Sequence, residues 1–368
     1  MGTGGTVWQQ ITDFPASTAF EVTSAAAVGD GFVAVGYGAM PGEGYFGRHQ
    51  GFVWRSADGR AWTPENDPAF QFVTPEEVVA LGDSVYVFGT IAECDQLFSD
   101  ECVEPPGSGW AVWRSTQGGA WERLPQEPQM QFGSVDGVAV TDTSLVAYGS
   151  TGDEAQAVVW TSADGATWTA TTQLGGMTQV TAVAGVPSGL ILFGDRFSDE
   201  IENIELVAAT AVDGTTFNPA GVPRLVGTSV RSITAGVGGL VAVGDREADD
   251  LRLTAVALQS ADGSTWTEAA APDGSFTNSG ASFVHAVPDG YVAVGFVPTD
   301  GAFGLSTGMS WLSADGLRWQ SLAPFGGEFT GLDASASAGP GIVAFTVTSE
   351  EPDETTVTST IGAWFMPH

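Results

Sequence analysis

Three side chains that could take part in catalysis or ligand binding lie near the starts of short apolar segments: Glu77, Asp136 and Arg231. Two carboxylates at a suitable separation act as general acid and base in glycoside hydrolysis. The guanidinium of Arg231 suits an anionic ligand, although a structural ion pair with a neighbouring carboxylate is the alternative. These residues are the candidates for a catalytic site. The positions that we align at this level are Thr23, Glu77, Asp136, Thr181, Arg231, Ala281 and Thr330.

Aromatic and polar side chains also gather in the first long loop. Tyr45 and Phe46 precede Arg48 and His49 there. Sugar rings stack on exposed aromatic faces while polar side chains bond their hydroxyls. The sequence therefore predicts a ligand-binding surface that includes these four residues and Arg231, whereas a lone His is more often a surface or core residue.

Acidic residues are concentrated in other loops of the same type. Several carboxylates together suit a hard cation such as Ca²⁺, and the candidate ligands are Asp195, Asp199, Asp249 and Asp250. Their spacing matches no ordered calcium loop, so a solvated acidic face is the alternative. The sequence contains no nucleophile elbow, phosphate-binding loop or metal-spaced His pair, and Ca²⁺ is the one cofactor considered.

The charge balance limits the partners. The chain has 44 acidic and 11 basic residues, a net charge of −33, and every basic residue is Arg. Such a field repels nucleic acid and anionic membranes, and no apolar run is long enough to span a bilayer. We therefore expect a glycan or protein ligand, no nucleic acid, no membrane insertion and a monomer. Solubility alone is the other explanation for the charge.

The two cysteines, Cys94 and Cys102, lie close together in one polar loop. Exported proteins often pin such a loop with a disulfide, and no neighbouring Cys or His completes a metal set. The first residues carry neither a charged nor an apolar region. We expect an extracellular or cell-surface protein whose signal peptide or lipid anchor is missing from this sequence.

The elements that would position these side chains follow from a repeat. A Gly or Ser, four apolar residues and a Gly recur, and the closing positions are 45 to 60 residues apart. That interval is typical of four-stranded propeller blades. The copies span 31–36, 84–89, 144–149, 189–194, 239–244, 290–295 and 341–346, the last ending in Thr346.

A second phrase, Ser-Ala-Asp-Gly followed by Trp three residues later, comes after most copies. Asp-Gly between two strands indicates a hairpin, because Gly accepts positive φ and the carboxylate bonds nearby backbone N–H groups. The aromatic residue should begin the outer strand and pack between blades. The predicted turn residues are Asp58, Asp164, Asp213, Asp262 and Asp315.

These patterns predict an all-β fold, a seven-bladed β-propeller of four-stranded antiparallel blades forming one domain over 1–368. The last repeat lacks an outer strand, and residues 6–11 resemble one, so the N-terminal strand should complete the last blade and remove an unpaired edge. The predicted blades span about 20–66, 74–125, 133–172, 178–220, 228–270, 280–323 and 328–366.

The Ser-Ala-Asp-Gly-x-x-Trp turn resembles the Asp-box, or BNR repeat, of sialidase-like propellers, with one residue fewer between Asp and Gly. The resemblance implies that the Asp residues stabilise hairpins on the face opposite the ligand. Sialidases of this group also use an Arg triad, a Tyr–Glu pair and an Asp acid. The early Arg-Ile-Pro signature and three converging Arg are missing here.

The predicted function is therefore recognition. We expect a non-catalytic, secreted or surface-tethered propeller that binds a glycan or protein on its loop face. One alternative is a glycosidase or polysaccharide lyase with its site at the central channel mouth, although a lyase acting on an acidic polysaccharide would want a basic cleft. A structural cell-surface module is the other.

Overall fold

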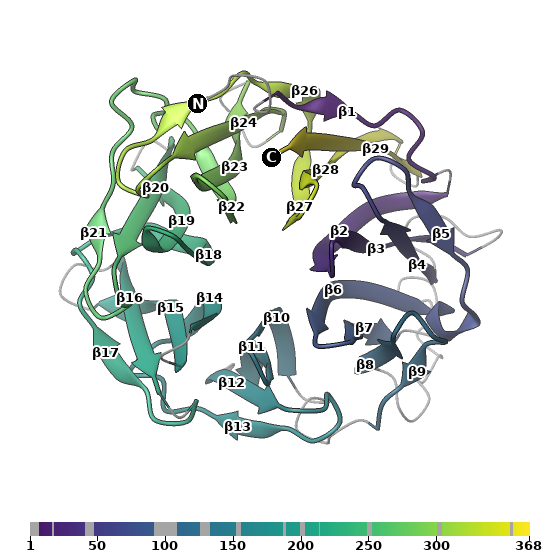
Figure 1. Ribbon diagram of the computed structural model, residues 1–368, viewed down its shortest axis with the longest axis horizontal. Coiled ribbons are helices and arrows are strands. Elements are labelled where there is room, and N and C mark those ends of the chain that lie inside the picture. The colour runs from purple at the N-terminus through teal and green to yellow at the C-terminus, as the bar shows by residue number, and fades with distance from the viewer. Residues whose placement is uncertain are drawn as a thin grey trace. The chain divides into compact units, whose positions relative to one another are not determined.

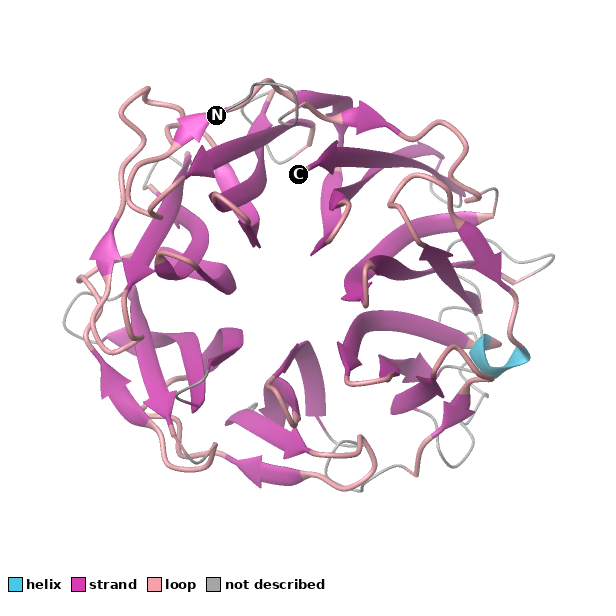
Figure 2. Ribbon diagram, viewed as in Figure 1, coloured by secondary structure: helices cyan, strands magenta, loops and turns pink. Residues whose placement is uncertain are grey.

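The computed structural model describes residues 7–16, 18–40, 48–91, 109–125, 133–151, 156–186, 189–198, 203–212, 214–248, 252–299, 304–353 and 356–368. Regular structure there is β-strand apart from one helical turn, η1 (Pro68–Phe70), drawn in cyan in Figure 2. No helix in this part of the chain is long and apolar enough to cross a membrane.

The strands form seven antiparallel sheets and fall into two compact units. The first unit holds blades 1, 2 and 7 (Figure 1). Blade 1 consists of β2 (Ala19–Val28), β3 (Gly31–Ala39), β4 (His49–Ser56) and β5 (Thr63–Glu65). Blade 2 consists of β6 (Val73–Leu81), β7 (Ser84–Ile91), β8 (Gly109–Thr116) and β9 (Glu122–Arg123). Blade 7 consists of β27 (Gly331–Ala338), β28 (Gly341–Asp353), β29 (Thr356–Pro367) and β1 (Gln9–Gln10).

The second unit holds blades 3 to 6. Blade 3 consists of β10 (Gly133–Val140), β11 (Leu145–Thr151), β12 (Gln156–Ser162) and β13 (Thr169–Thr171). Blade 4 consists of β14 (Gln179–Val186), β15 (Gly189–Ser198), β16 (Asn203–Ala211) and β17 (Asn218–Ala220). Blade 5 consists of β18 (Thr228–Gly236), β19 (Gly239–Glu247), β20 (Leu253–Ser260) and β21 (Thr267–Glu268). Blade 6 consists of β22 (Gly280–Val287), β23 (Gly290–Pro298), β24 (Ser306–Ser313) and β25 (Gln320–Ser321). An additional strand, β26 (Phe325–Phe329), pairs with β24.

The two ends of the chain share one sheet. Gln9 and Gln10 of β1 lie opposite Phe365 and Trp364 of β29. The N-terminal strand thus supplies the fourth strand of blade 7, which confirms the prediction of a seven-bladed β-propeller completed in this way.

The repeated apolar phrase forms the second strand of each blade. In β3, Val33, Ala34 and Val35 are completely buried, as expected where both faces of a strand are covered. A Cβ at the closing glycine, Gly36, would clash with the backbone carbonyl oxygen of Glu21 on the inner strand. Only glycine fits at this point. Gly89, Gly149, Gly194, Gly244 and Gly295 face the equivalent carbonyl in their own blades.

The inner strand of every blade contains a β-bulge at one common register. The bulge residues are Thr23, Glu76, Asp136, Thr181, Arg231, Ser282 and Asp333. The alignment made from sequence was right for four of them but placed Glu77, Ala281 and Thr330 at this level. The slip arose because a bulge is defined by pairing with the second strand, and the sequence does not reveal the register.

The Asp-Gly turns connect third and outer strands. In blade 1, Asp58 Oδ1 accepts the backbone N–H groups of Arg60 and Ala61 at 2.8 and 2.9 Å, and Ser56 Oγ accepts that of Gly59 at 2.9 Å. These backbone hydrogen bonds hold the pKa of Asp58 below its usual value. Trp62 follows, buried among residues of blades 1 and 7.

Candidate functional site

The second unit contains a pocket between blades 4 and 5, with a volume of about 410 Å³. It is open to solvent, and its lining residues come from β15 and β16 of blade 4 and from β18, β19 and adjoining residues of blade 5. The residues that line it include Asp195, Ile204, Arg231, Asp245 and Glu247.

Two aspartates line the pocket, and each directly follows the closing glycine of a second strand. Asp195 comes after Gly194 on β15, and Asp245 occupies the same position on β19. Arg231, the bulge residue of β18, binds Asp245 in a bidentate pair, with Nε–Oδ1 at 2.5 Å and Nη2–Oδ2 at 3.0 Å. The side chain of Asp245 is buried, while that of Arg231 is 53% exposed. The pair therefore neutralises Asp245, and the Arg231 side chain stays half exposed in the pocket lining.

Asp195 lacks such a partner. It is 9% exposed, and its Oδ1 is buried without a hydrogen bond. Its backbone is fixed, since the carbonyl oxygen accepts both the N–H and the hydroxyl of Thr178, at 2.8 and 2.9 Å. Burial raises the pKa of Asp195 to about 6, and the charge of Arg231 opposes this rise. An unpaired buried acceptor costs about 1–3 kcal/mol of stability, so a donor from a ligand would relieve it.

An apolar pair, Ile204 from the pocket lining and Phe197 opposite it, forms what we call the rim. Phe197 and Ile204 lie opposite each other on β15 and β16, 56% and 44% exposed. Leu206 lies two residues further along β16, and because side chains alternate along a strand it shares their face. Leu206 is buried against residues of blade 5, so the packed contact between these blades ends where the pocket begins.

The first unit carries a group of carboxylates on neighbouring inner strands. Burial raises the pKa values of Glu21, Glu76 and Asp333, that of Asp333 to about 7, and the charge of Glu21 raises the last two further. A hydrogen bond with Tyr37 opposes the rise at Glu21. These groups come from β2, β6 and β27 (Figure 1). Their mutual repulsion favours protonated forms.

His49 and Arg48 lie beside this region. The ring of His49 stacks on Tyr37 with centroids 4.5 Å apart, and its Nδ1 lies 2.8 Å from Thr74 Oγ1. The guanidinium of Arg48 lies over the ring of Phe72 at 5.3 Å. Both predicted ligand residues therefore contact neighbouring side chains of the first unit.

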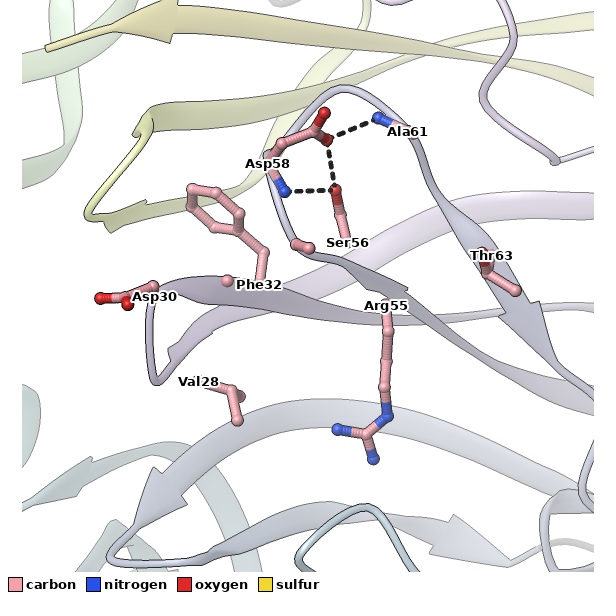
Figure 3. A pocket seen from close by; sticks show the side chains of 10 residues that line it. Val28, Asp30, Phe32, Arg55, Ser56, Asp58, Ala61 and Thr63 are labelled. Atoms are coloured by element: carbon pink, nitrogen blue, oxygen red, sulfur yellow. Dashed lines mark hydrogen bonds between the residues drawn. The ribbon is translucent and has the colours of Figure 1, made fainter.

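A second pocket, of about 660 Å³, lies in blade 1 beside the Asp58 turn (Figure 3). Arg55 lines it and points away from Asp58 in Figure 3. Its Nε donates to Glu65 Oε1 at 2.6 Å, and its guanidinium lies over Trp121 at 5.7 Å. Arg55 Nη2 is buried without a hydrogen-bond partner, but the charge of Arg55 is already paired with Glu65. The pocket beside Asp195 is the stronger candidate, because its unpaired group is a carboxylate without an ion-pair partner.

The structure brings Arg231 and Asp195, predicted for different roles, into one pocket. The other two catalytic candidates are not among its lining residues: Asp136 is exposed on β10, and Glu77 on β6 of the first unit binds Ser24. The predicted turn residues Asp164, Asp262 and Asp315 lie among the described residues. Other predicted residues lie outside them: Tyr45, Phe46, Cys94, Cys102, Asp199, Asp213, Asp249 and Asp250. In the described part of the chain, no group of three or more His, Cys, Asp or Glu is placed to hold a metal ion.

Sequence reasoning missed Asp245 as the partner of Arg231, and the apolar rim. A signal exists: Gly-Asp-Arg follows the apolar phrase of the second strand in two consecutive blades, at 194–196 and 244–246. That repetition places two aspartates at equivalent positions on neighbouring blades. It does not show which one Arg231 binds.

No protein-family model matches the chain, and no curated protein sequence matches it. Among solved structures, it is similar to Ycf48 bound to a D1 peptide, with a TM-score of 0.56 and 11% identity over 100% of this chain and 97% of that chain. It is also similar to a PL25 ulvan lyase bound to -[GlcA(1-4)Rha3S]-, with a TM-score of 0.57 and 10% identity over 98% and 96%. A Trypanosoma rangeli sialidase gives a TM-score of 0.45 and 12% identity over 95% of this chain and 54% of that chain. The likenesses to Ycf48 and to the ulvan lyase show the fold.

Proposed function

We propose that this chain is a non-catalytic recognition propeller of the cell exterior, related to the Asp-box propellers, which binds a protein segment in the pocket between blades 4 and 5. The observation that carries the proposal is Asp195, a residue that lines the open pocket and whose buried Oδ1 has no hydrogen-bond partner. A rigid, unsatisfied acceptor beside an apolar rim is a feature of binding sites, which combine few polar groups with apolar surface.

A protein ligand suits the pocket better than a glycan. The exposed rim pairs an aliphatic side chain, Ile204, with one aromatic, Phe197, whereas sugar recognition generally uses aromatic platforms. Ycf48, one of the similar structures, is bound to a peptide. A glycan remains the second candidate ligand, because another similar structure is a polysaccharide lyase bound to an oligosaccharide.

The test selects random-sequence peptides displayed on phage against the immobilised protein. Asp195→Asn/Arg231→Gln serves as counter-target. In parallel, the protein is incubated with a panel of neutral and acidic polysaccharides, and retention, reducing ends and unsaturated products are measured. We expect enriched peptides that bind the wild type and not the double variant, with no product released. Sugar release abolished by Glu77→Gln or Asp136→Asn would instead make the protein a carbohydrate-active enzyme. Retention of a polysaccharide without enriched peptides would make it a lectin.

A further inference from the structure

The pocket between blades 4 and 5 has an excess of negative charge. Arg231 neutralises Asp245 through two hydrogen bonds. Asp195 and Glu247 then remain without a paired cation in the pocket lining. Arg196 on β15 and Arg224 before β18 both bind Glu205, at 3.1 and 3.0 Å. Arg246 on β19 binds Glu268 at 2.8 Å.

We infer that the pocket receives a basic side chain, Arg or Lys, from a protein partner, and that an apolar residue beside it in the partner packs on Phe197 and Ile204. This rests on the proposed function and names the chemistry of its ligand. The cation would pair with the carboxylate of Asp195, which lines the pocket and whose Oδ1 has no hydrogen bond within the protein. Charge-assisted bonds of this type are the strong ones.

The polar groups of the pocket are arranged for such a donor. Asp195 is held by its own backbone contacts with Thr178, so little ordering is needed on binding. Arg231 is held by Asp245 and cannot swing to Asp195 without breaking its bidentate pair. Its exposed N–H groups can bond a backbone carbonyl of the same ligand.

The rim supplies the remaining contact. Phe197 and Ile204 are exposed neighbours on one face of the β15–β16 hairpin. The long stem of Lys or Arg packs on apolar surface while its charged end reaches a carboxylate, and an aromatic face attracts a nearby cation. The net charge of −33 would accelerate encounter with a basic partner, more so at low salt.

The experiment measures binding of labelled synthetic peptides Gly-Ser-Leu-Xaa-Gly-Ser by fluorescence anisotropy, with Xaa as Arg, Lys, Gln or Glu. We expect the Arg and Lys peptides to bind at least tenfold more tightly than the Gln and Glu peptides. Asp195→Asn, which keeps the shape of the side chain, should abolish that preference. Asp289→Asn removes an exposed acid of blade 6 that does not line the pocket, and should leave binding unchanged.

The rim is tested with Ile204→Ser against Val237→Ser, since Val237 is 78% exposed and lies in a turn outside the pocket. Ile204→Ser should weaken the Leu-Arg peptide about fivefold or more, and Val237→Ser should not. Circular dichroism melting curves check that each variant folds. Equal binding of all four peptides, or an unchanged preference in Asp195→Asn, overturns the inference while leaving a peptide-binding function intact. Binding of a neutral polysaccharide that Asp195→Asn abolishes, with no binding of any peptide, overturns both.

Discussion

Ser24 on β2 donates its hydroxyl to Glu77 Oε2 on β6 at 2.8 Å, and its oxygen accepts the backbone N–H of Val78 at 3.2 Å. Glu77 thus joins the inner strands of blades 1 and 2. Burial is the main cause that raises its pKa to about 7, Glu76 adds to the rise, and the Ser24 hydrogen bond opposes it. These contacts favour a packing role for Glu77 over the catalytic role considered from sequence.

The raised pKa of Glu77 predicts that stability falls as pH rises. The folded state binds this proton more tightly than the unfolded chain, whose carboxyl has a pKa near 4.5. The stabilising contribution is therefore complete below pH 4.5 and is lost as pH rises through about 7. Burial also raises the pKa of Asp333 to about 7, so Asp333 adds to the same loss of stability. The thermal midpoint should be higher at pH 5 than at pH 8.

Glu77→Gln should increase the free energy of unfolding at pH 8 by about 1–2 kcal/mol and change it little at pH 5. The reason is that Gln keeps an acceptor for Ser24 without a charge to bury. Urea denaturation at both pH values measures the effect. Glu328→Gln, at an exposed position of β26, is the control and should shift stability by less than about 0.5 kcal/mol at either pH. A wild type that is more stable at pH 8 than at pH 5 would contradict this assignment.

Binding of a basic peptide should weaken as pH falls through 6. The pKa of Asp195 is about 6 without ligand, and a bound cation would lower it, so ligand binding releases a proton. Affinity should then be complete about one pH unit above 6 and fall about tenfold by pH 5. The other charged groups lining the pocket are Arg231, Asp245 and Glu247. Isothermal titration from pH 5 to 7.5 tests this, and a profile that Asp195→Asn leaves unaltered would sink it.

Much of the fold could be read from the sequence because its signals are local. The closing glycines are required by contact with the neighbouring strand, as at Gly36. The Asp-Gly turns are held within a few residues, as at Asp58. The departure at Thr346 depends instead on a residue of the neighbouring strand. A Cβ at Gly362, opposite it on β29, would meet the Thr346 hydroxyl, so this glycine leaves room for the larger residue.

The candidate site was harder to predict from the sequence than the fold, because it depends on how the strands pair. Glu76, not Glu77, is the bulge residue of β6, and that single step decides which side chain projects from the bulge. The bond between Arg231 and Asp245 joins residues that are 14 positions apart. The buried state of Asp195 arises from packing of blade 5 against blade 4, which no pattern around Gly194 specifies.

Gly244→Ala should be strongly destabilising. A Cβ at this position would clash with the backbone carbonyl oxygen of Ser229 on the neighbouring inner strand, and a displaced backbone atom cannot rotate away as a side chain can. We expect a loss of about 2–3 kcal/mol. Because Asp245 is the next residue, peptide binding should weaken as well. Gly327→Ala is the matched control, since a Cβ there meets no heavy atom within 4 Å. Equal melting temperatures for the two variants would refute the proposed contact.

Asp58→Ala should destabilise the protein without affecting the pocket. The carboxylate holds the backbone N–H groups of Arg60 and Ala61 in the turn between β4 and β5, and the exposed site limits the loss to about 1–2 kcal/mol. Asp30→Ala, at an exposed turn of the same blade, is the control and should cost less than about 0.5 kcal/mol. Urea midpoints measure stability, and anisotropy with the Leu-Arg peptide measures binding. If Asp58→Ala abolished peptide binding while the fold remained stable, the Asp58 turn would have to be considered part of the ligand site, and the assignment of recognition to blades 4 and 5 would fail.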